Sequence, residues 1–256
     1  MRRGGSLFRM LKLKPPHGWV AVAWELAIVT IGVLLALAAQ QWADERSWNS
    51  KVQGTTSAIR QEVADHYYWS VEWRMVQPCV MAQIDALSRR VMASGATLNP
   101  APTFQERSRY SFVLRLPSKE YSSSAWQAAQ SDGVTSRFDP AIRKELGQMY
   151  EQSRILSELT DRNGIDYRRL LTLSRPIPLD PSVRLSLLAE LDELRGRAEF
   201  VDLESGQLID HIVRLKMVPP AEEARAAVER YGTYRFCKVH GLPMRSFDAA
   251  RAPVEN

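Results

Sequence analysis

The sequence lacks the short motifs that most often mark an active site or a metal site. With two cysteines and four histidines in 256 residues, it has no Cys-x-x-Cys pair, no His-Glu-x-x-His, no Gly-rich phosphate loop and no Gly-x-Ser-x-Gly elbow. His66, His211 and His240 are scattered along the chain. The first two directly follow an aspartate, but neighbours on a helix point in different directions and do not form a catalytic dyad. We therefore expect no catalytic residue, no cofactor and no metal.

Acidic residues are absent from the first 18 positions of the chain. Five of the 34 basic residues lie in this stretch: Arg2, Arg3, Arg9, Lys12 and Lys14. The remaining 29 basic residues balance the 29 acidic ones, so the formal net charge of +5 belongs to this short tail. A basic excess confined to a tail beside an apolar run is typical of a membrane topology signal and not of a nucleic-acid groove. We therefore expect no nucleic-acid partner.

A run almost without charge follows, from Gly18 to Ala39, and Glu25 is its only ionisable residue. As a helix that rises about 1.5 Å per residue, the run is roughly 33 Å long, enough for a hydrocarbon core of about 30 Å. No later stretch approaches this length without charges, so the sequence predicts one transmembrane helix over 18–42. Lys and Arg beside a span are retained inside. Residues 1–17 are therefore expected to be a cytoplasmic tail in a bacterial inner membrane, with the C-terminal domain in the periplasm.

A cleaved secretory signal is the alternative to this anchor. Ala36-Leu37-Ala38 before Ala39 satisfies the small-x-small rule for a cleavage site. The apolar run is, however, longer than the roughly 7 to 15 residues usual in a signal peptide, and it contains Glu25. An uncleaved anchor is therefore the preferred prediction.

Tryptophans lie at both ends of the predicted span. They are Trp19 and Trp24 on one side, and Trp42 and Trp48 on the other. Amphipathic indole rings prefer the interface between membrane and water, so we expect these four to be interface anchors. The alternative is that each ring fills a protein core.

Glu25, Gly32 and Ala36 are candidates for contacts inside the membrane. An acid in a span is costly, by roughly 2.5 kcal/mol or more if charged at the centre, and so is a functional candidate by default. Gly32 and Ala36 are four residues apart, and small residues on one face allow a second helix to approach closely. These features fit a helix that associates with a partner. A tolerated acid near the interface of a monomeric anchor explains Glu25 equally well.

The segment Glu25 to Leu37, ELAIVTIGVLLAL, is followed by Gln41-Trp42 and then by Glu45-Arg46. This pattern resembles the N-terminal signature of a widespread group of uncharacterised bacterial single-span membrane proteins. The resemblance covers about residues 20 to 50. It implies an inner-membrane protein with an extracytoplasmic helical part, and it implies no activity.

After the span, apolar residues recur at spacings of three and four. They predict an all-α fold, in which the transmembrane helix continues into an extracytoplasmic α-helical bundle over 43–238, with a C-terminal tail over 239–256. Helices are expected over 44–75, over 79–92 after an interruption at Pro78, from Asp139-Pro140, over 167–173 after a break at Asn163-Gly164, from Asp180-Pro181 and from Pro220. Residues 112–116 are the only strand-like run and are too short to build a sheet.

The two cysteines, Cys79 and Cys237, both follow the span, where the predicted topology places them in an oxidising compartment. A disulfide is the preferred interpretation. It would close a loop of about 158 residues and restrict the unfolded chain by roughly 5 kcal/mol in the entropy model. Two unpaired thiols are the alternative, because spacing in sequence does not place their Cα atoms within about 7 Å.

We expect a non-enzymatic protein that is anchored in the lipid bilayer and whose outer domain binds a partner protein, such as another membrane protein, or a second copy of this chain. One alternative is a ligand-sensing domain, which would have to act through a membrane partner because the expected cytoplasmic tail is too short for an output domain. Another is an enzyme with an unfamiliar constellation. The aromatic group Tyr67, Tyr68, Trp69 and Trp73 would suit a ligand pocket, but a helix-packing or membrane-proximal face explains it better.

Overall fold

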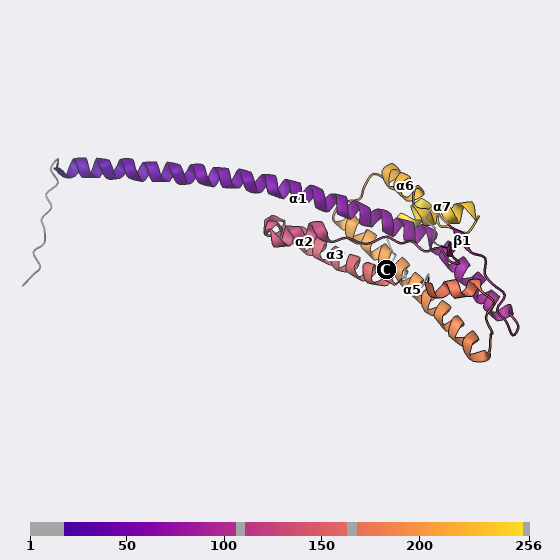
Figure 1. Cartoon of the computed structure of the whole chain (residues 1–256). Coiled ribbons are helices and arrows are strands. Elements are labelled where there is room, and N and C mark those ends of the chain that lie inside the picture. The colour runs from indigo at the N-terminus through magenta and orange to yellow at the C-terminus, as the bar shows by residue number, and fades with distance from the viewer. Residues whose placement is uncertain (1–17, 106–110, 163–167, 253–256) are drawn as a thin grey trace, which may run out of the picture. The chain divides into compact units, whose positions relative to one another are not determined.

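The computed structural model describes residues 18–105, 111–162 and 168–252, and these are mostly helical with almost no sheet, as the sequence predicts (Figure 1). The elements are α1 (Gly18–Ala93), β1 (Phe104–Gln105), β2 (Ser111–Phe112), α2 (Ser124–Ser131), the 3₁₀ helix η1 (Val134–Arg137), α3 (Pro140–Asp161), the 3₁₀ helix η2 (Leu171–Ser174), α5 (Pro181–Arg214), α6 (Ala221–Glu229), α7 (Gly232–Val239) and α8 (Phe247–Arg251). β1 and β2 form one antiparallel pair. Contacts divide the chain into two units, Met1–Gln53 and Gly54–Asn256.

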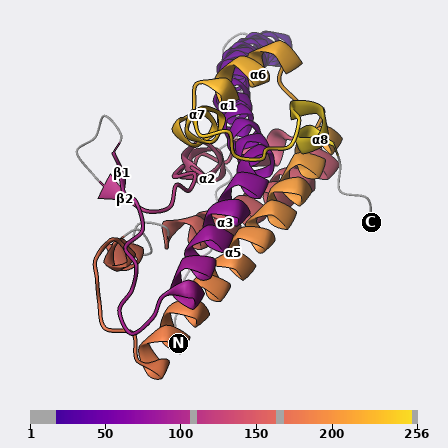
Figure 2. The ribbon, with the colours of Figure 1, turned by 90° about the vertical axis from the view of Figure 1, so that its right-hand side faces the viewer.

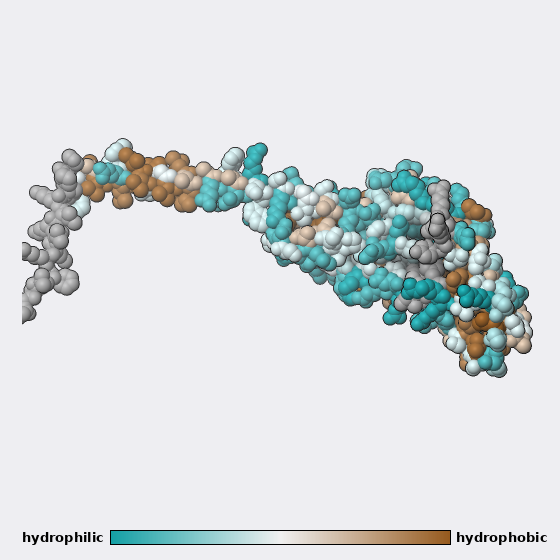
Figure 3. Space-filling model, in the orientation of Figure 1, coloured by the Kyte–Doolittle hydropathy of each residue, from teal (hydrophilic) through white to brown (hydrophobic). Residues whose placement is uncertain are grey.

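The described part of the first unit is the N-terminal part of α1, and its large apolar side chains have no protein around them. Val20 is 84% exposed and Leu35 is 66% exposed. Figure 3 shows the corresponding stretch of the surface as strongly hydrophobic. The helix is long enough and apolar enough to cross a membrane by length and composition. The predicted tail over 1–17 lies outside the described residues.

The second unit is built on the C-terminal part of α1, with α3 and α5 beside it (Figure 2). On α1 the buried side chains include Ile59, Val63, Val76, Val80 and Ile84. Ile59 and Val63 are four residues apart, as are Val76, Val80 and Ile84, so within each group the side chains lie on one face of the helix. Fully burying each such side chain stabilises the fold by about 1.5–3 kcal/mol. Tyr150 and Ser153 of α3 and Arg195 of α5 form side-chain contacts with this part of α1.

Two helix starts confirm the prediction from Asp-Pro pairs. Asp139 Oδ1 accepts the backbone N–H of Ala141 at 2.8 Å, and Asp180 Oδ1 accepts that of Ser182 at 2.8 Å. In both helices proline occupies the first turn, where a missing N–H costs no helical hydrogen bond. α6 also starts directly after Pro220, as expected. The expected break at Asn163-Gly164 lies outside the described residues.

The prediction that Pro78 interrupts the first outer helix is wrong, because α1 continues through it to Ala93. Proline has no N–H to donate to the carbonyl four residues earlier, which is that of Arg74. Arg245 compensates for this loss. Its Nη1 donates to the Arg74 carbonyl oxygen at 3.2 Å, and its backbone N–H donates to the Met75 carbonyl oxygen at 2.9 Å. Arg245 also pairs with Asp202 of α5.

Three short helices, α2, α7 and α8, were not expected from the sequence. Each has at most eight residues, which is too short for apolar periodicity to stand out. α8 lies in the segment expected to be a tail, and there Phe247 and Ala250 are buried in the core. The chain therefore packs into the second unit well beyond residue 238.

Arg245→Ala is expected to lower the free energy of unfolding by about 1–3 kcal/mol, because it leaves the Arg74 carbonyl and Asp202 without a hydrogen-bond donor. In a Pro78→Ala background the Arg74 carbonyl regains its helical partner. The same substitution should then cost at least about 0.5 kcal/mol less. Chemical denaturation of the full-length protein in detergent measures both values. The exposed Arg143→Ala, on α3, is the matched control, and an equal cost of Arg245→Ala in both backgrounds would contradict this compensation.

Candidate ligand pocket beside the disulfide

α7 is held against α1 by a buried carboxyl group at its N-terminal end. Glu72 of α1 is 1% exposed and accepts hydrogen bonds from the backbone of Tyr234 and Thr233. These residues belong to the first turn of α7, whose N–H groups have no partner within the helix. The positive end of the helix dipole also favours a carboxylate there. Glu72 thus supplies a cap that the sequence around α7 does not contain.

The two cysteines lie about two turns further along α1 and about one turn further along α7, at the distance of a disulfide. Their Sγ atoms are 2.06 Å apart and their Cα atoms 6.0 Å apart. Both are fully buried. The structure therefore supports the preferred interpretation of the sequence, in which Cys79 of α1 is bonded to Cys237 of α7. The disulfide joins α7 to a residue within the continuous helix α1, whereas the sequence predicted a turn between two helices at Cys79.

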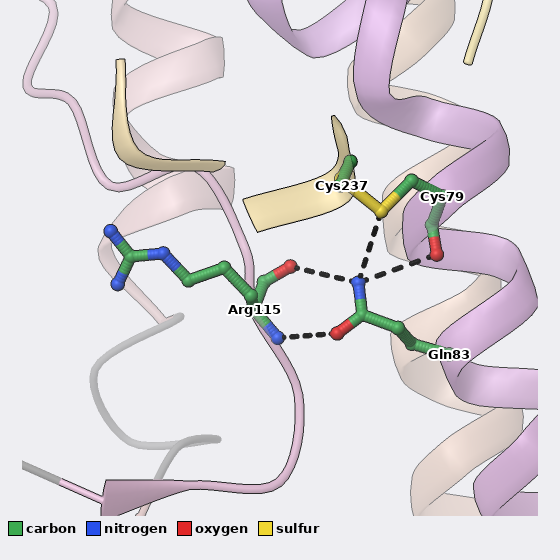
Figure 4. Close-up of a disulfide and its surroundings, with 4 residues drawn as sticks. All are labelled: Cys79, Gln83, Arg115 and Cys237. Atoms are coloured by element: carbon green, nitrogen blue, oxygen red, sulfur yellow. Dashed lines mark hydrogen bonds between the residues drawn. A yellow bond between two sulfur atoms is a disulfide. The ribbon is translucent and has the colours of Figure 1, made fainter. Parts of the chain in front are cut away.

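Gln83 joins the same region to the chain that follows β2 (Figure 4). Its Oε1 accepts the backbone N–H of Arg115 at 2.8 Å, and its Nε2 donates to the Arg115 carbonyl oxygen at 3.3 Å. The same Nε2 lies 3.4 Å from Cys79 Sγ. Figure 4 shows the Arg115 side chain directed away from Gln83 and the disulfide. Gln83 thus fixes the Arg115 backbone, and the Arg115 guanidinium lies over the Phe112 ring, 5.4 Å from its centroid.

A cavity of about 710 Å³ lies between α7 and the β1–β2 pair. One side of this cavity, called the aromatic wall below, consists of the rings of Phe104, Phe112, Phe236 and His240. The rings of Phe104 and Phe236 meet edge to face with centroids 5.0 Å apart, and those of Phe236 and His240 are 4.4 Å apart. Such arrangements of ring pairs are favourable beyond their burial. The wall is therefore a packed unit and not a loose group of side chains.

A second cavity of about 280 Å³ shares Phe104, Phe236 and His240 with the first and extends along α1 to Arg90. Arg115 and Arg235 line the larger cavity. No aspartate or glutamate is among the described residues that line either cavity. The pair of cavities is therefore basic and aromatic, which favours a ligand with a negative charge.

Glu62, His66 and Ser153 are residue types found in catalytic triads, but all three are buried and not open to a substrate. Ser153 Oγ lies 3.0 Å from His66 Nδ1, and Glu62 Oε2 accepts the hydroxyl of Tyr150 at 2.7 Å. His66 is 0% exposed and Ser153 is 1% exposed, and neither lines the two cavities. Glu62 also accepts the backbone N–H of Ala125 at the start of α2. The group therefore packs α1 against α2 and α3.

Burial has opposite effects on the ionisable groups of this interior. It lowers the pKa of His66 to about 4, although the nearby charge of Glu62 opposes the shift. It raises the pKa of Glu72 to about 7, although the backbone hydrogen bond from Tyr234 opposes that shift. For Glu62, burial raises the pKa, but hydrogen bonds from Tyr150, Ser122 and Ala125 outweigh it and the net pKa is lowered.

The other residues predicted from the sequence are placed as follows. Glu25, Gly32, Ala36, Trp19, Trp24 and Trp42 are exposed, Trp48 is partly buried, and all belong to the first unit. None of them lines either cavity. Tyr67, Tyr68 and Trp73 are buried in the core, which supports the packing interpretation of that aromatic group. Among the described residues, no cluster of three or more His, Cys, Asp or Glu could hold a metal ion.

Sequence reasoning missed the cavity because its walls come from three separate segments, near 83–90, 104–115 and 232–240. His240 was one of the scattered histidines, and only folding brings it against Phe104. Searches against protein-family models, curated proteins and solved structures found no match to this chain.

Replacing both Cys79 and Cys237 by alanine is expected to lower the free energy of unfolding by up to about 5 kcal/mol, because the unfolded chain loses a constraint on a loop of about 158 residues. Denaturation with and without dithiothreitol measures the effect. The reductant should destabilise the native protein and leave the double variant unchanged. Mass spectrometry under non-reducing conditions should find the linked peptides, and two alkylatable thiols in protein from native membranes would rule out the bond.

Glu72→Gln is expected to become more stable relative to the native protein as the pH rises from 5 to 8. The folded pKa of Glu72 is about 7, above its ordinary value of 4.5, so the folded state favours the protonated carboxyl. Its contribution is complete below pH 4.5 and is lost as the pH rises through 7. The difference in unfolding free energy should change by about 2–3 kcal/mol over that range. Denaturant titrations at several pH values measure it.

His66→Gln provides the opposite comparison. The folded pKa of His66, about 4, lies below its ordinary value of 6.5, so the native protein gains stability from neutral His66 as the pH rises from 4 to 6.5. The variant lacks this gain and should fall behind the native protein over that range. Differences that stay constant with pH for both variants would show that neither group has a shifted pKa.

Proposed function

We propose that the protein is a non-enzymatic, single-span membrane protein whose helical domain binds a partner protein or a second copy of this chain. The observation that carries the proposal is the uncovered apolar part of α1. Leaving apolar surface in water costs roughly 25 cal/mol per Å². Side chains such as Leu34 and Leu35 therefore need hydrocarbon or another helix around them, and the length of the run suits a bilayer.

The proposed topology places the N-terminus in the cytoplasm and the second unit in the periplasm of a bacterial inner membrane. Its support is the basic residues before Gly18, since Lys and Arg beside a span are retained inside. A bonded Cys79–Cys237 pair agrees with this side, because disulfides persist in oxidising compartments. The resemblance of residues 20–50 to bacterial single-span proteins points the same way.

A helix partner in the membrane is proposed from the face that contains Glu25, Gly32 and Ala36. Their spacings of seven and four place them on one side of α1. A Cβ atom added at Gly32 would meet no atom within 4 Å. The small residues therefore have no role in packing within the chain, and close approach of a second helix gives them one.

A second candidate function is ligand sensing by the outer domain. It is favoured by the 710 Å³ cavity with its aromatic wall and arginines. In that case a signal would pass to the cytoplasm through a partner helix at the same face of α1.

Gly32→Leu is expected to reduce crosslinked species of the full-length protein in intact cells at least severalfold, because the larger side chain keeps a second helix away. Membrane insertion should stay unchanged, since the site is open within the chain. The matched control is Ala27→Leu, about 140° round the helix from Gly32. Crosslinking with a short lysine-reactive or photoreactive reagent, followed by gel analysis, gives the readout.

Extraction at alkaline pH tests the anchor itself, and the native protein should stay with the membranes. Release of a shortened protein that begins near Ala39 would show a cleaved signal instead.

Crosslinking that finds only monomer and no co-purifying protein would contradict the interaction function. Protease digestion of the second unit only from the periplasmic side would support the proposed topology.

A further inference from the structure

We propose that the cavities beside α7 bind a small organic anion, in which a carboxylate or sulfonate is joined to an aromatic body. This inference does not depend on how the protein is anchored, because every residue that carries it belongs to the second unit. It assigns the cavities a ligand class, and it assigns Arg235 and Phe236 as the residues that recognise the two ends of the ligand.

The charge of the cavities selects an anion. Arg115 and Arg235 line the larger cavity and Arg90 lines the smaller, while no acidic residue lines either among the described residues. A guanidinium presents parallel N–H donors that match the two oxygens of a carboxylate or sulfonate. Arg235 is exposed on α7, next to Phe236, so its side chain is available to a ligand without unfolding any element.

The aromatic wall selects the other end of the ligand. Phe104 and Phe236 are only partly buried although their rings pack edge to face, so parts of both rings remain open to the cavities. Phe104 lies at 67° to His240, with centroids 4.9 Å apart. A flat aromatic group can add to such a cluster in an offset or edge-to-face arrangement, at ring distances of about 4.5–7 Å.

The size of the site suits a small molecule. The larger cavity, about 710 Å³, falls within the roughly 300–1,000 Å³ of ligand sites in proteins. The smaller one, about 280 Å³, adjoins it across the shared rings and offers room for an extension of the aromatic body.

Packing of α7 against α1 does not by itself explain why Arg235, Phe236 and Val239 line the larger cavity. Thr233, Tyr234 and Cys237 supply the buried face of the helix, and the disulfide and Glu72 already attach it to α1. Val239 lines the larger cavity and is nevertheless 80% exposed. An apolar body in the cavity would cover Val239 and the open parts of the rings, and so gain the free energy of their burial.

Equilibrium dialysis of the full-length protein in lipid nanodiscs, against empty nanodiscs, tests the proposal. The probe is 2-naphthalenesulfonate, detected by its ultraviolet absorbance, and its neutral comparator is 2-naphthamide. We expect saturable binding of one sulfonate per chain, about tenfold tighter than the amide, because only the sulfonate forms a charge-assisted hydrogen bond with the Arg235 guanidinium. A cationic analogue, 2-naphthylmethylammonium, should not bind above the blank.

Arg235→Gln should weaken sulfonate binding about tenfold and leave amide binding unchanged, for the same reason. Arg143→Gln, an exposed arginine on α3, is the matched control and should change neither. Phe236→Leu should weaken both ligands, and its thermal unfolding shows whether it folds. The exposed Arg235 substitution keeps the test valid even if the Phe236 variant does not fold.

Three results would overturn the proposal. They are no saturable binding of the sulfonate up to millimolar concentration, equal affinity for the sulfonate and the amide, and equal loss of sulfonate binding in Arg143→Gln and Arg235→Gln. If Arg235→Gln removes the preference for the sulfonate over the amide and Arg143→Gln keeps it, the site is established.

Discussion

The continuity of α1 through Pro78 is the constraint on which the second unit depends. A proline in a helix removes the hydrogen bond to the residue four positions earlier and usually bends or ends the helix. Here the Arg74 and Met75 carbonyls accept hydrogen bonds from Arg245 instead, and Arg245 is itself held by Asp202. Because the helix continues through Pro78, Glu72 before the proline and Cys79 after it lie on the same face of α1.

The continuity of α1 positions the parts of the domain that have little core of their own. α7 has only eight residues and would not be stable alone, since isolated helices shorter than about 12–15 residues are marginal in water. α1 supplies its N-terminal cap through Glu72 and its covalent link through Cys79. α2, also short, is capped from α1 in the same manner by Glu62. Buried carboxyl groups on one long helix thus substitute for caps that the short helices lack.

The candidate ligand pocket follows from this attachment. With the inner face of α7 occupied by α1, its other side, with Arg235, Phe236 and His240, is left to meet the β1–β2 pair. Gln83, one turn beyond Cys79, fixes the backbone of Arg115 on the opposite side of the cavity. The disulfide and the pocket are therefore parts of one arrangement, because Cys237 directly follows Phe236 on α7 and Gln83 lies beside both the bond and the smaller cavity.

The sequence by itself determined the features that depend on neighbours along the chain. The apolar run in α1, the Asp139 and Asp180 caps and the all-α class follow from local composition and spacing, because helix periodicity and capping involve residues within a few positions. Only the tertiary structure decided whether Pro78 ends a helix, since the compensating donor, Arg245, is 167 positions away. It also decided that residues near 83–90, 104–115 and 232–240 share a cavity, because long-range packing leaves no periodic signal in any one segment.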